Sequence, residues 1–255
     1  MTAERELALK YLPVFMLDEK EPFDMKAVGY TIFRNDLRSD SFPKRVIAAD
    51  WEKTDCVIEY EIWFDYDIQH LYELEHVWVY VGKDGGVQKA EGSFHGKYLN
   101  QVNLDTGKPP LDENGRVCVY LQPGKHAVLS DPRLVRLVPQ WQESCGELAG
   151  LDGVPLPEMF QDVMAVPDEA AQEMVHRYIR KNFSFEPSLR FVPFFPETSL
   201  PEKELLLPWP ELKASVPKRL QKELPAEELL IPWEQLKSSV PGRLKKELEK
   251  IREAE

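Results

Sequence analysis

Cysteine is scarce in this sequence, with three residues among 255. Cys56, Cys118 and Cys145 are widely spaced and odd in number, and none belongs to a Cys-x-x-Cys pair. This pattern argues against a disulfide framework and against a zinc site made of thiolates. Cys56 and Cys118 lie in strand-like segments and are expected to be small buried residues, whereas Cys145, in ESCGELAG, leaves open a role as a nucleophile.

Long apolar runs and an excess of basic residues are also missing. No stretch approaches the roughly eighteen apolar residues of a membrane helix, and Glu4 and Glu6 stand where a signal peptide would be basic. We therefore expect a cytoplasmic protein without a transmembrane segment. The net charge of −12 argues against nucleic acid as a partner, because binding it needs a basic surface. Residues 201–255 hold eleven acidic and eleven basic residues, so the excess acid lies in residues 1–200 and favours cations.

Strand-forming segments dominate residues 8–138. They are rich in Val, Ile, Tyr, Trp and Phe and are separated by Pro, Gly, Asn and Asp, as in CVIEYEIWFDYD, HVWVYVG and RVCVYL. The sequence KDGG at 83–86 predicts a hairpin turn, because glycine adopts the positive φ that such turns require. Strands and helices do not alternate, so we predict a mainly β protein, an antiparallel β-sandwich. The segment PDEAAQEMVHRYIRKNF predicts one peripheral helix over 168–182.

An internal repeat occupies the C-terminal part of the sequence. The segment ELLLPWPELKASVPKRLQKEL at 204–224 recurs as ELLIPWEQLKSSVPGRLKKEL at 228–248, with 15 of 21 positions identical. Each copy begins with Pro-Trp, continues through a short turn, and then has a Ser-Val-Pro element. Ser215 and Ser239 are suited to cap a second helical stretch there. The sequence therefore predicts a tail of two helical repeats.

These features predict three parts of the chain. They are a metal-binding β-sandwich body at 1–187 that includes the helix at 168–182, a proline-rich and aromatic linker at 188–203, and two 24-residue helical repeats at 204–255. Two such repeats are too few to form a free-standing solenoid. We expect Trp209 and Trp233 to be buried against the body, against a second copy of the chain in self-association, or against another protein.

Histidine is the residue type that points to chemistry. Four of the five histidines lie between residues 70 and 126, in or beside strand-like segments that carry many carboxylates. Imidazole and carboxylate are the groups that bind a divalent cation when thiolates are absent. We therefore predict a metal site made from some of six residues: Asp67, His70, Glu73, Glu75, His95 and His126. The alternative is that these carboxylates form the solvated face of a sheet.

Two sequence elements resemble a known family. The segment QHLYELEH is followed about twenty residues later by SFHGKY. The pair resembles the heptad GHRHDWE and the later Ser-x-His-Gly-x-Tyr element of the necrosis- and ethylene-inducing-peptide-like cytolysins. The first segment is also similar to the DWEHV element of a related fungal vacuolar-sorting protein family. Tyr72 and Leu74 depart from the heptad, where the family has histidine and tryptophan.

The resemblance covers residues 55–98 and implies both a fold and a site. The fold is a β-sandwich, which agrees with the strand pattern. The implied metal ligands are His70, Glu73 and Glu75, together with Asp67 or Asp65 from the preceding strand.

The types of ligand lead to two functional hypotheses. Several histidines together with several carboxylates suit Zn, Mn or Fe better than Ca, which prefers oxygen ligands alone. The first hypothesis is a divalent-metal-dependent enzyme, hydrolytic, that acts on a small or lipid-like substrate with Glu73 as general base. The second is a non-catalytic, metal-stabilised binding module that recognises a polar head group or a protein partner.

Overall fold

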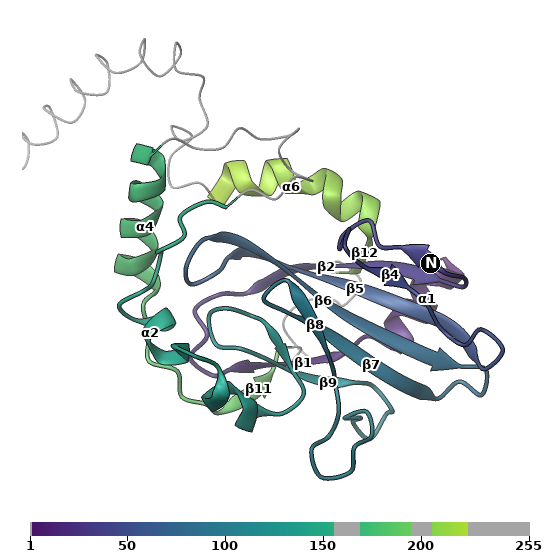
Figure 1. The fold of residues 1–255 in the computed structure, drawn as a ribbon. Coiled ribbons are helices and arrows are strands. Elements are labelled where there is room, and N and C mark those ends of the chain that lie inside the picture. The colour runs from purple at the N-terminus through teal and green to yellow at the C-terminus, as the bar shows by residue number, and fades with distance from the viewer. Residues whose placement is uncertain (1, 156–168, 195–205, 224–255) are drawn as a thin grey trace, which may run out of the picture.

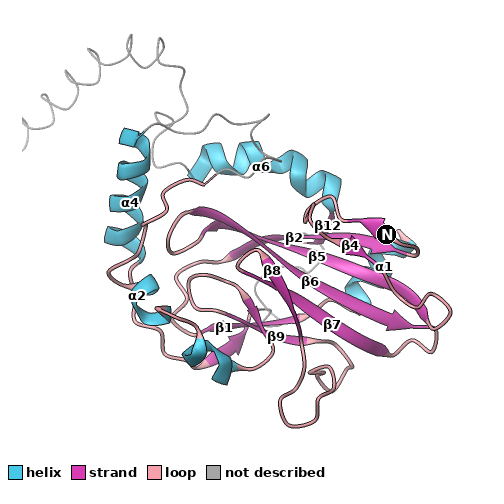
Figure 2. Cartoon of the chain, in the orientation of Figure 1, coloured by secondary structure: helices cyan, strands magenta, loops and turns pink. Residues whose placement is uncertain are grey.

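The computed structural model describes residues 2–155, 169–194 and 206–223, which are coloured in Figure 1. The chain is mainly β, as the distribution of strands in Figure 2 shows. This part of the prediction is confirmed. Within the described ranges, none of the helices has both the length and the apolar character that crossing a membrane would take.

The larger sheet has six strands in the order β12-β2-β5-β6-β7-β8. Their bounds are Leu206–Pro208 (β12), Met25–Phe33 (β2), Thr54–Tyr66 (β5), Leu71–Gly82 (β6), Val87–Phe94 (β7) and Lys97–Asn100 (β8). From β2 to β8 each strand is antiparallel to its neighbour. The turn between β6 and β7 is the predicted KDGG hairpin, in which Gly85 has a φ of 79°.

Two smaller sheets complete the β structure. The four-stranded sheet has the order β10-β9-β1-β11, with Val128–Leu129 (β10), Cys118–Leu121 (β9), Val14–Asp18 (β1) and Phe191–Pro193 (β11). Leu37–Arg38 (β3) and Val46–Ile47 (β4) form a two-stranded sheet. The loop between β3 and β4 is important below, because it covers buried carboxylates of the larger sheet.

The sheets are mixed, whereas the sequence predicted antiparallel pairing throughout. Strand β1 is parallel to β9, and β12 is parallel to β2. Parallel neighbours need a long connection between them, and both pairs join segments about 100 or more residues apart. Local strand patterns carry no information about such distant pairings. The arrangement of the sheets as a sandwich stays a prediction.

Buried apolar side chains cover both faces of the central strands. The largest cluster draws on both main sheets, with Phe15 of β1, Val119 of β9 and Val79 of β6 among its members. A second cluster is centred on Trp78. Each large apolar side chain contributes roughly 1.5–3 kcal/mol when it is buried, so these clusters hold β5 and β6 rigidly in place. That rigidity matters because β6 and the turn before it carry four of the candidate ligands, Asp67, His70, Glu73 and Glu75.

The helices lie at the margins of the sheets, as Figure 2 shows. They are Ala3–Lys10 (α1), the 3-10 helix Pro132–Leu137 (η1), Trp141–Cys145 (α2), Glu169–Phe183 (α4) and Trp209–Glu223 (α6). Helix α4 confirms the predicted helix, within one residue at each end. Helix α6 differs from the prediction, because it begins at Trp209 and runs through the Ser-Val-Pro element. Ser215 is therefore not a cap; its hydroxyl donates to the Leu212 carbonyl at 2.8 Å.

Two described segments bear on the predicted division of the chain. Strand β11 lies in the range assigned to the linker, and it pairs with β1 as part of the four-stranded sheet. Strand β12 and helix α6 come from the first repeat, and they contact β2. The second repeat, at 228–248, lies outside the described residues. The three-part division itself stays a prediction.

Candidate functional site

A pocket of about 860 Å³ opens where β7 separates from β6. The backbone ladder between these strands ends at the pair Val77 and Gly92, so residues 71–76 of β6 are outside the ladder with β7. The lining includes several of the predicted ligands: His70, Glu73, Glu75 and His95. Four of the six predicted ligands thus line one cavity, and the other two, Asp67 and His126, are described below.

A tight turn holds Asp67 beside His70. The Asp67 carboxylate accepts a hydrogen bond from the backbone N–H of Gln69 at 2.6 Å, and its own N–H donates to the His70 carbonyl at 2.9 Å. An aspartate that bonds to the backbone two residues later is a common turn former. Asp67 is fully buried behind the pocket wall. Its Oδ2 has no hydrogen-bond partner among the described residues.

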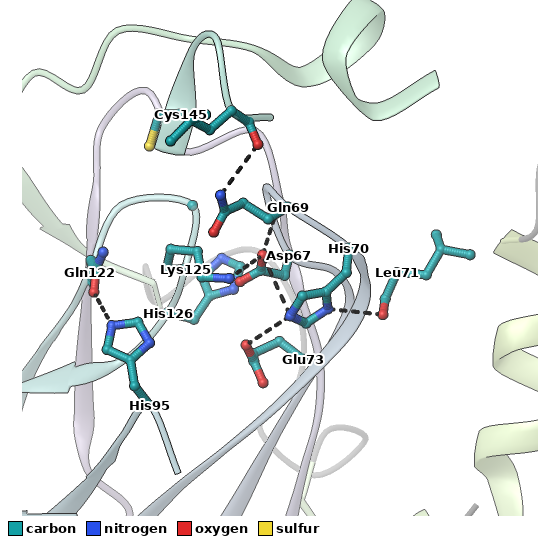
Figure 3. Close-up of polar contacts among 12 residues, drawn as sticks. Asp67, Gln69, His70, Leu71, Glu73, His95, Gln122, Lys125, His126 and Cys145 are labelled. Carbon is teal, nitrogen blue, oxygen red and sulfur yellow. Dashed lines mark hydrogen bonds and ion pairs between the residues drawn. The ribbon is translucent and has the colours of Figure 1, made fainter. Parts of the chain in front are cut away.

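His70 directs one ring nitrogen toward two carboxylates, as Figure 3 shows. Its Nε2 lies 3.7 Å from Oδ1 of Asp67 and 3.9 Å from Oε2 of Glu73. Single ligand atoms of the three side chains all lie within 4.8 Å of one another. The other nitrogen, Nδ1, is 3.2 Å from the Leu71 carbonyl. Because a carbonyl only accepts, Nδ1 carries the proton in a neutral ring, and Nε2 presents its lone pair to the carboxylates.

Lys125 reaches the same cluster from the loop between β9 and β10. Its Nζ donates to Oδ1 of Asp67 at 2.9 Å. Gly124, at a φ of 69°, lets this loop approach, because a Cβ there would lie 2.8 Å from Ile68. The Ile68 N–H donates to the Gly124 carbonyl at 2.8 Å. A glycine in a left-handed conformation thus places an ammonium group beside the buried aspartate.

The carboxylates at this end of the pocket are removed from water and repel one another, and both effects change their pKa values. Burial raises the pKa of Glu73 well above its usual value, and the charges of Glu75 and Asp67 add to that rise. Burial likewise raises the pKa of Glu75 to about 7, despite the hydrogen bond it accepts from Ser93. Burial also acts to raise the pKa of Asp67, but the charges of His70 and Lys125 outweigh it and the pKa is lowered. A cation would relieve the repulsion among these carboxylates.

His95 and His126 lie in different surroundings. His95 lines the pocket from the turn between β7 and β8, and its Nε2 is 3.1 Å from the side-chain oxygen of Gln122. Burial lowers its pKa, which favours the neutral form that binds metals. His126 is fully buried behind the pocket and stacks on Phe64, with ring centroids 3.7 Å apart. Its Nε2 lies 3.4 Å from Oε1 of Glu21, so the structure does not bring His126 into the pocket.

The backbone is strained at three points around the site. Tyr72, His95 and His126 have φ values of 53°, 47° and 57°. Only two other non-glycine residues in the described part of the chain have positive φ. Side chains with a Cβ rarely adopt this conformation, and such residues tend to gather at functional sites. The strain therefore supports the pocket as the functional centre.

The solvated-face alternative does not describe these strands. Four carboxylates of the acidic segment are buried: Glu59, Glu61, Asp65 and Asp67. Asp65 accepts a hydrogen bond from the Trp63 indole at 2.7 Å, and Glu61 accepts one from Thr31 at 2.9 Å. These two therefore have structural partners of their own. Of the two aspartates that the resemblance left open, Asp67 is the one beside His70.

Sequence patterns missed several residues of the site. Lys125 precedes His126 in QPGKHA, so the adjacency was visible, but its bond to Asp67 depends on the docking of two loops. Ser93 belongs to the SFHGKY element but was not predicted to contact Glu75, and no pattern singled out Glu21. Cys145, open as a nucleophile from sequence, is buried and donates to the Pro123 carbonyl. Burial raises the pKa of its thiol, so the reactive thiolate is not favoured.

Comparison with known proteins gives no further assignment. Neither the protein-family models, nor the curated protein sequences, nor the solved structures include a match to this chain. Function must therefore be argued from the pocket itself.

Proposed function

We propose that the chain is a divalent-metal-dependent enzyme, hydrolytic, whose metal is bound by Asp67, His70 and Glu73. The observation that carries this proposal is the orientation of His70. In its neutral form, His70 directs a lone pair at two carboxylates, 3.7 and 3.9 Å away, and a cation between the three groups would relieve the repulsion; a protonated ring would instead form ion pairs with both. These separations exceed hydrogen bonds and leave room for a metal. The bond from Nδ1 to a backbone carbonyl is the usual way in which a metal-binding histidine is oriented.

The remaining pocket residues suit the chemistry of hydrolysis. A bound transition metal would supply Lewis acidity and an activated water. If Glu73 serves as a ligand, it is no longer available as the general base that the sequence suggested. Glu75 takes that role in our proposal, because a carboxyl with a pKa of about 7 can both accept and release a proton near neutral pH. Lys125 is placed to stabilise developing negative charge.

The opposite wall of the pocket indicates the substrate class. It is formed by the end of β3, which contributes Arg38 to the lining, and by the loop that follows, which contributes Phe42 and Lys44. Basic side chains in a chain of net charge −12 favour an anionic group on the ligand, and the aromatic ring favours an apolar portion. We propose a small or lipid-like substrate that carries a phosphate or carboxylate.

The second candidate is a metal-stabilised binding module without catalysis. Lys125 favours it, because an ammonium 2.9 Å from Asp67 already neutralises one carboxylate and occupies one of its oxygens. In this case the same pocket recognises a polar head group or a peptide side chain. The sandwich fold and the relation to the cytolysins belong to either version of the proposal. Their support is the position of His70, Glu73 and Glu75 on β6 and in the preceding turn, with Asp67 beside them.

Metal analysis tests the common part of both versions. Protein purified without an affinity tag is analysed for bound metals, then stripped and titrated calorimetrically with Zn, Mn, Fe and Ca. His70→Ala should weaken binding by about 100-fold or more, since even outer partners of a ligand contribute about 10–100-fold. His176→Ala is the matched control, because His176 lies 3.9 Å from Glu173 at the same three-residue spacing on α4. Equal loss in both variants, or no metal bound by the full chain, would overturn the site.

Substitution of His95 separates the enzyme from the module. His95 lines the pocket but is not one of the three clustered ligands. His95→Ala should abolish turnover of a panel of nitrophenyl esters and phosphoesters while the metal stays bound, if the chain is an enzyme. A metal-loaded full chain that turns over none of the panel, yet binds anionic ligands in a His95-dependent manner, would favour the module.

A further inference from the structure

The first repeat docks on a defined surface of the larger sheet, which we call the tail site. Strand β12 lies parallel to β2, with Leu206 opposite Val28 and Pro208 opposite Tyr30. Helix α6 follows and contacts β2 and β5 (Figure 1). Trp209, Leu212 and Val216 of α6 are buried. The tail site consists of residues 28–30 of β2 and of Asp40, which is described next.

The backbone of Gly29, which lacks a side chain, and the carboxylate of Asp40 give the tail site its specificity. Leu212 packs directly on the backbone of Gly29, because a Cβ at that position would lie 3.0 Å from the leucine side chain. Asp40, in the loop between β3 and β4, accepts hydrogen bonds from the Trp209 indole at 2.8 Å and from Lys213 at 3.1 Å. The site therefore selects a short strand, a tryptophan, and a leucine and a lysine three and four residues after it.

The second copy of the repeat retains every one of these features in its sequence. The strand segment Leu-Leu-Pro at 206–208 recurs as Leu-Ile-Pro at 230–232. The four contact residues of α6, which are Trp209, Leu212, Lys213 and Val216, recur as Trp233, Leu236, Lys237 and Val240.

Four of the six substitutions between the two copies fall within residues 206–216, and these four avoid the contact surface. Pro210, Glu211 and Ala214 are replaced in the second copy by Glu, Gln and Ser, and all three are exposed on α6. The partly buried Leu207 is replaced by isoleucine, which is equally apolar. Retention of the buried positions and variation of the exposed ones is what a shared receptor surface requires.

We propose that residues 228–248 are a second ligand for the tail site, which therefore accepts either copy from the same chain in two registers 24 residues apart. Chain length sets the balance between the registers. Twelve residues, 194–205, connect β11 to β12 in the first copy, whereas thirty-six, 194–229, precede the equivalent point of the second copy. Closure of the longer loop is less probable by roughly fivefold. The first copy is thus the preferred occupant, and the second competes with it.

Exchange of the two copies at the tail site would act on the pocket through the loop that contains Asp40. Arg38 and Ser41, on either side of Asp40 in the sequence, line the pocket. A docked copy holds this loop from outside by its tryptophan and lysine. The copy that is not docked is available to a partner, while the docked copy continues to hold the loop that forms the pocket wall.

Hydrogen exchange of the full chain, followed by mass spectrometry, tests the proposal. In the unchanged chain the first copy should be protected only about fivefold, because the second displaces it for part of the time. Trp233→Ala/Leu236→Ala should raise protection of residues 206–216 several-fold. Trp209→Ala/Leu212→Ala should transfer protection to residues 230–240, and Lys213→Glu, a milder change that repels Asp40, should do so in part. The fourfold variant should leave both copies unprotected.

Three outcomes would overturn the proposal. The first is simultaneous strong protection of both copies in the unchanged chain, which would mean that they occupy separate surfaces. The second is protection of the first copy that does not change when the second is disabled. The third is protection of residues 230–240 that depends on protein concentration, with a dimer in sedimentation, which would make a second copy of the chain the occupant.

Discussion

Two groups of buried carboxylates lie within a few residues of each other on the central strands, and they differ in how completely they are bonded. Glu59 is enclosed by three donors. Its Oε1 accepts from Ser39 at 3.0 Å and from Ser41 at 2.8 Å, and its Oε2 accepts from the Trp78 indole at 2.6 Å. Both oxygens are used, and the surrounding residues are buried. Glu59 therefore has a structural role, because its hydrogen bonds fix the loop between β3 and β4.

The pocket carboxylates have no such enclosure. Oδ2 of Asp67 has no hydrogen-bond partner in the described part of the chain. Oε1 of Glu73 accepts from the N–H of its own neighbour, Leu74, at 2.8 Å. Asp67 and Glu75 are buried like Glu59, so burial alone does not mark a functional centre. Glu59 and the pocket carboxylates differ in spare coordinating capacity. Because Oε2 of Glu61 is also buried without a hydrogen-bond partner among the described residues, an unbonded oxygen marks a candidate ligand only in or beside the pocket.

The largest effect should come from removing the enclosed carboxylate. Glu59→Ala leaves two hydroxyls and one indole N–H buried without an acceptor, and each costs about 1–3 kcal/mol. We expect the free energy of unfolding in urea to fall by about 3 kcal/mol or more. Glu73→Gln is the comparison from the pocket; it should change the free energy of unfolding of the metal-free protein by less than about 1 kcal/mol. Equal losses would remove the distinction between the two groups.

Acid should destabilise the protein through His76, which belongs to the enclosed group. His76 is buried, and its Nε2 lies 3.0 Å from Ser41 Oγ. Burial and the nearby Arg45 charge lower its pKa to about 3. The unfolded chain, with a pKa near 6.5, therefore binds the proton more readily, so stability is lost as the pH falls below about 6.5.

The measurement is the difference in pH dependence between the unchanged chain and His76→Asn. Between pH 7 and pH 5 the unchanged chain should lose about 2 kcal/mol more in free energy of unfolding than the variant. A difference near zero would mean that His76 is protonated in the folded protein, contrary to its buried position.

Substitution of Lys125 tests the open group. Lys125→Met removes an ammonium that competes with a divalent cation for Asp67. Opposed charges about 4 Å apart interact by about 4 kcal/mol at an effective dielectric of 20, of which we expect part to be recovered. Metal affinity measured by calorimetry should therefore rise by about tenfold or more. If the ammonium group of Lys125 is the only cation that pairs with these carboxylates, the variant will be less stable and its metal affinity will not rise.

The acidic and histidine-rich segment shows what could be predicted from sequence. Its strands, its hairpin turn and the three-residue spacing of His70 and Glu73 are local properties, and the structure has each of them where the sequence placed them. The sequence pattern could not supply the structure that covers these strands. The loop that donates to Glu59 and the glycine that seats Lys125 act through contacts between distant segments.

His126 shows the limit most clearly. It follows Lys125 directly, and the sequence placed His126, but not Lys125, among the candidate ligands. A φ of 57° at His126 turns the chain there, and the two side chains separate. Lys125 lines the pocket, and His126 stacks behind it on Phe64. The side chains of two adjacent residues thus enter different surroundings, and no residue pattern specifies the backbone conformation at which they separate. The two parallel pairings, β1 with β9 and β2 with β12, escaped prediction for the same reason of distance along the chain.

The smallest effect concerns the outer side of the loop that Glu59 holds from inside. Asp40 is exposed over 69% of its side chain, and exposed pairs contribute about 0–1 kcal/mol. Asp40→Ala should therefore lower the free energy of unfolding by less than about 1 kcal/mol. It should nevertheless speed hydrogen exchange of residues 206–216, because Trp209 and Lys213 both lose their acceptor.

Asp36→Ala is the matched control, since Asp36 accepts from the Trp51 indole at 2.6 Å in a similarly exposed position. The two variants should lose similar stability, but only Asp40→Ala should release the tail. Metal affinity should stay within about twofold of the unchanged chain in both, because Glu59 still holds the loop beside the pocket. A large loss of metal affinity in Asp40→Ala would show that the loop depends on the contacts of Asp40 as much as on Glu59. The contrast between the enclosed carboxylate Glu59 and the open carboxylates of the pocket would then fail.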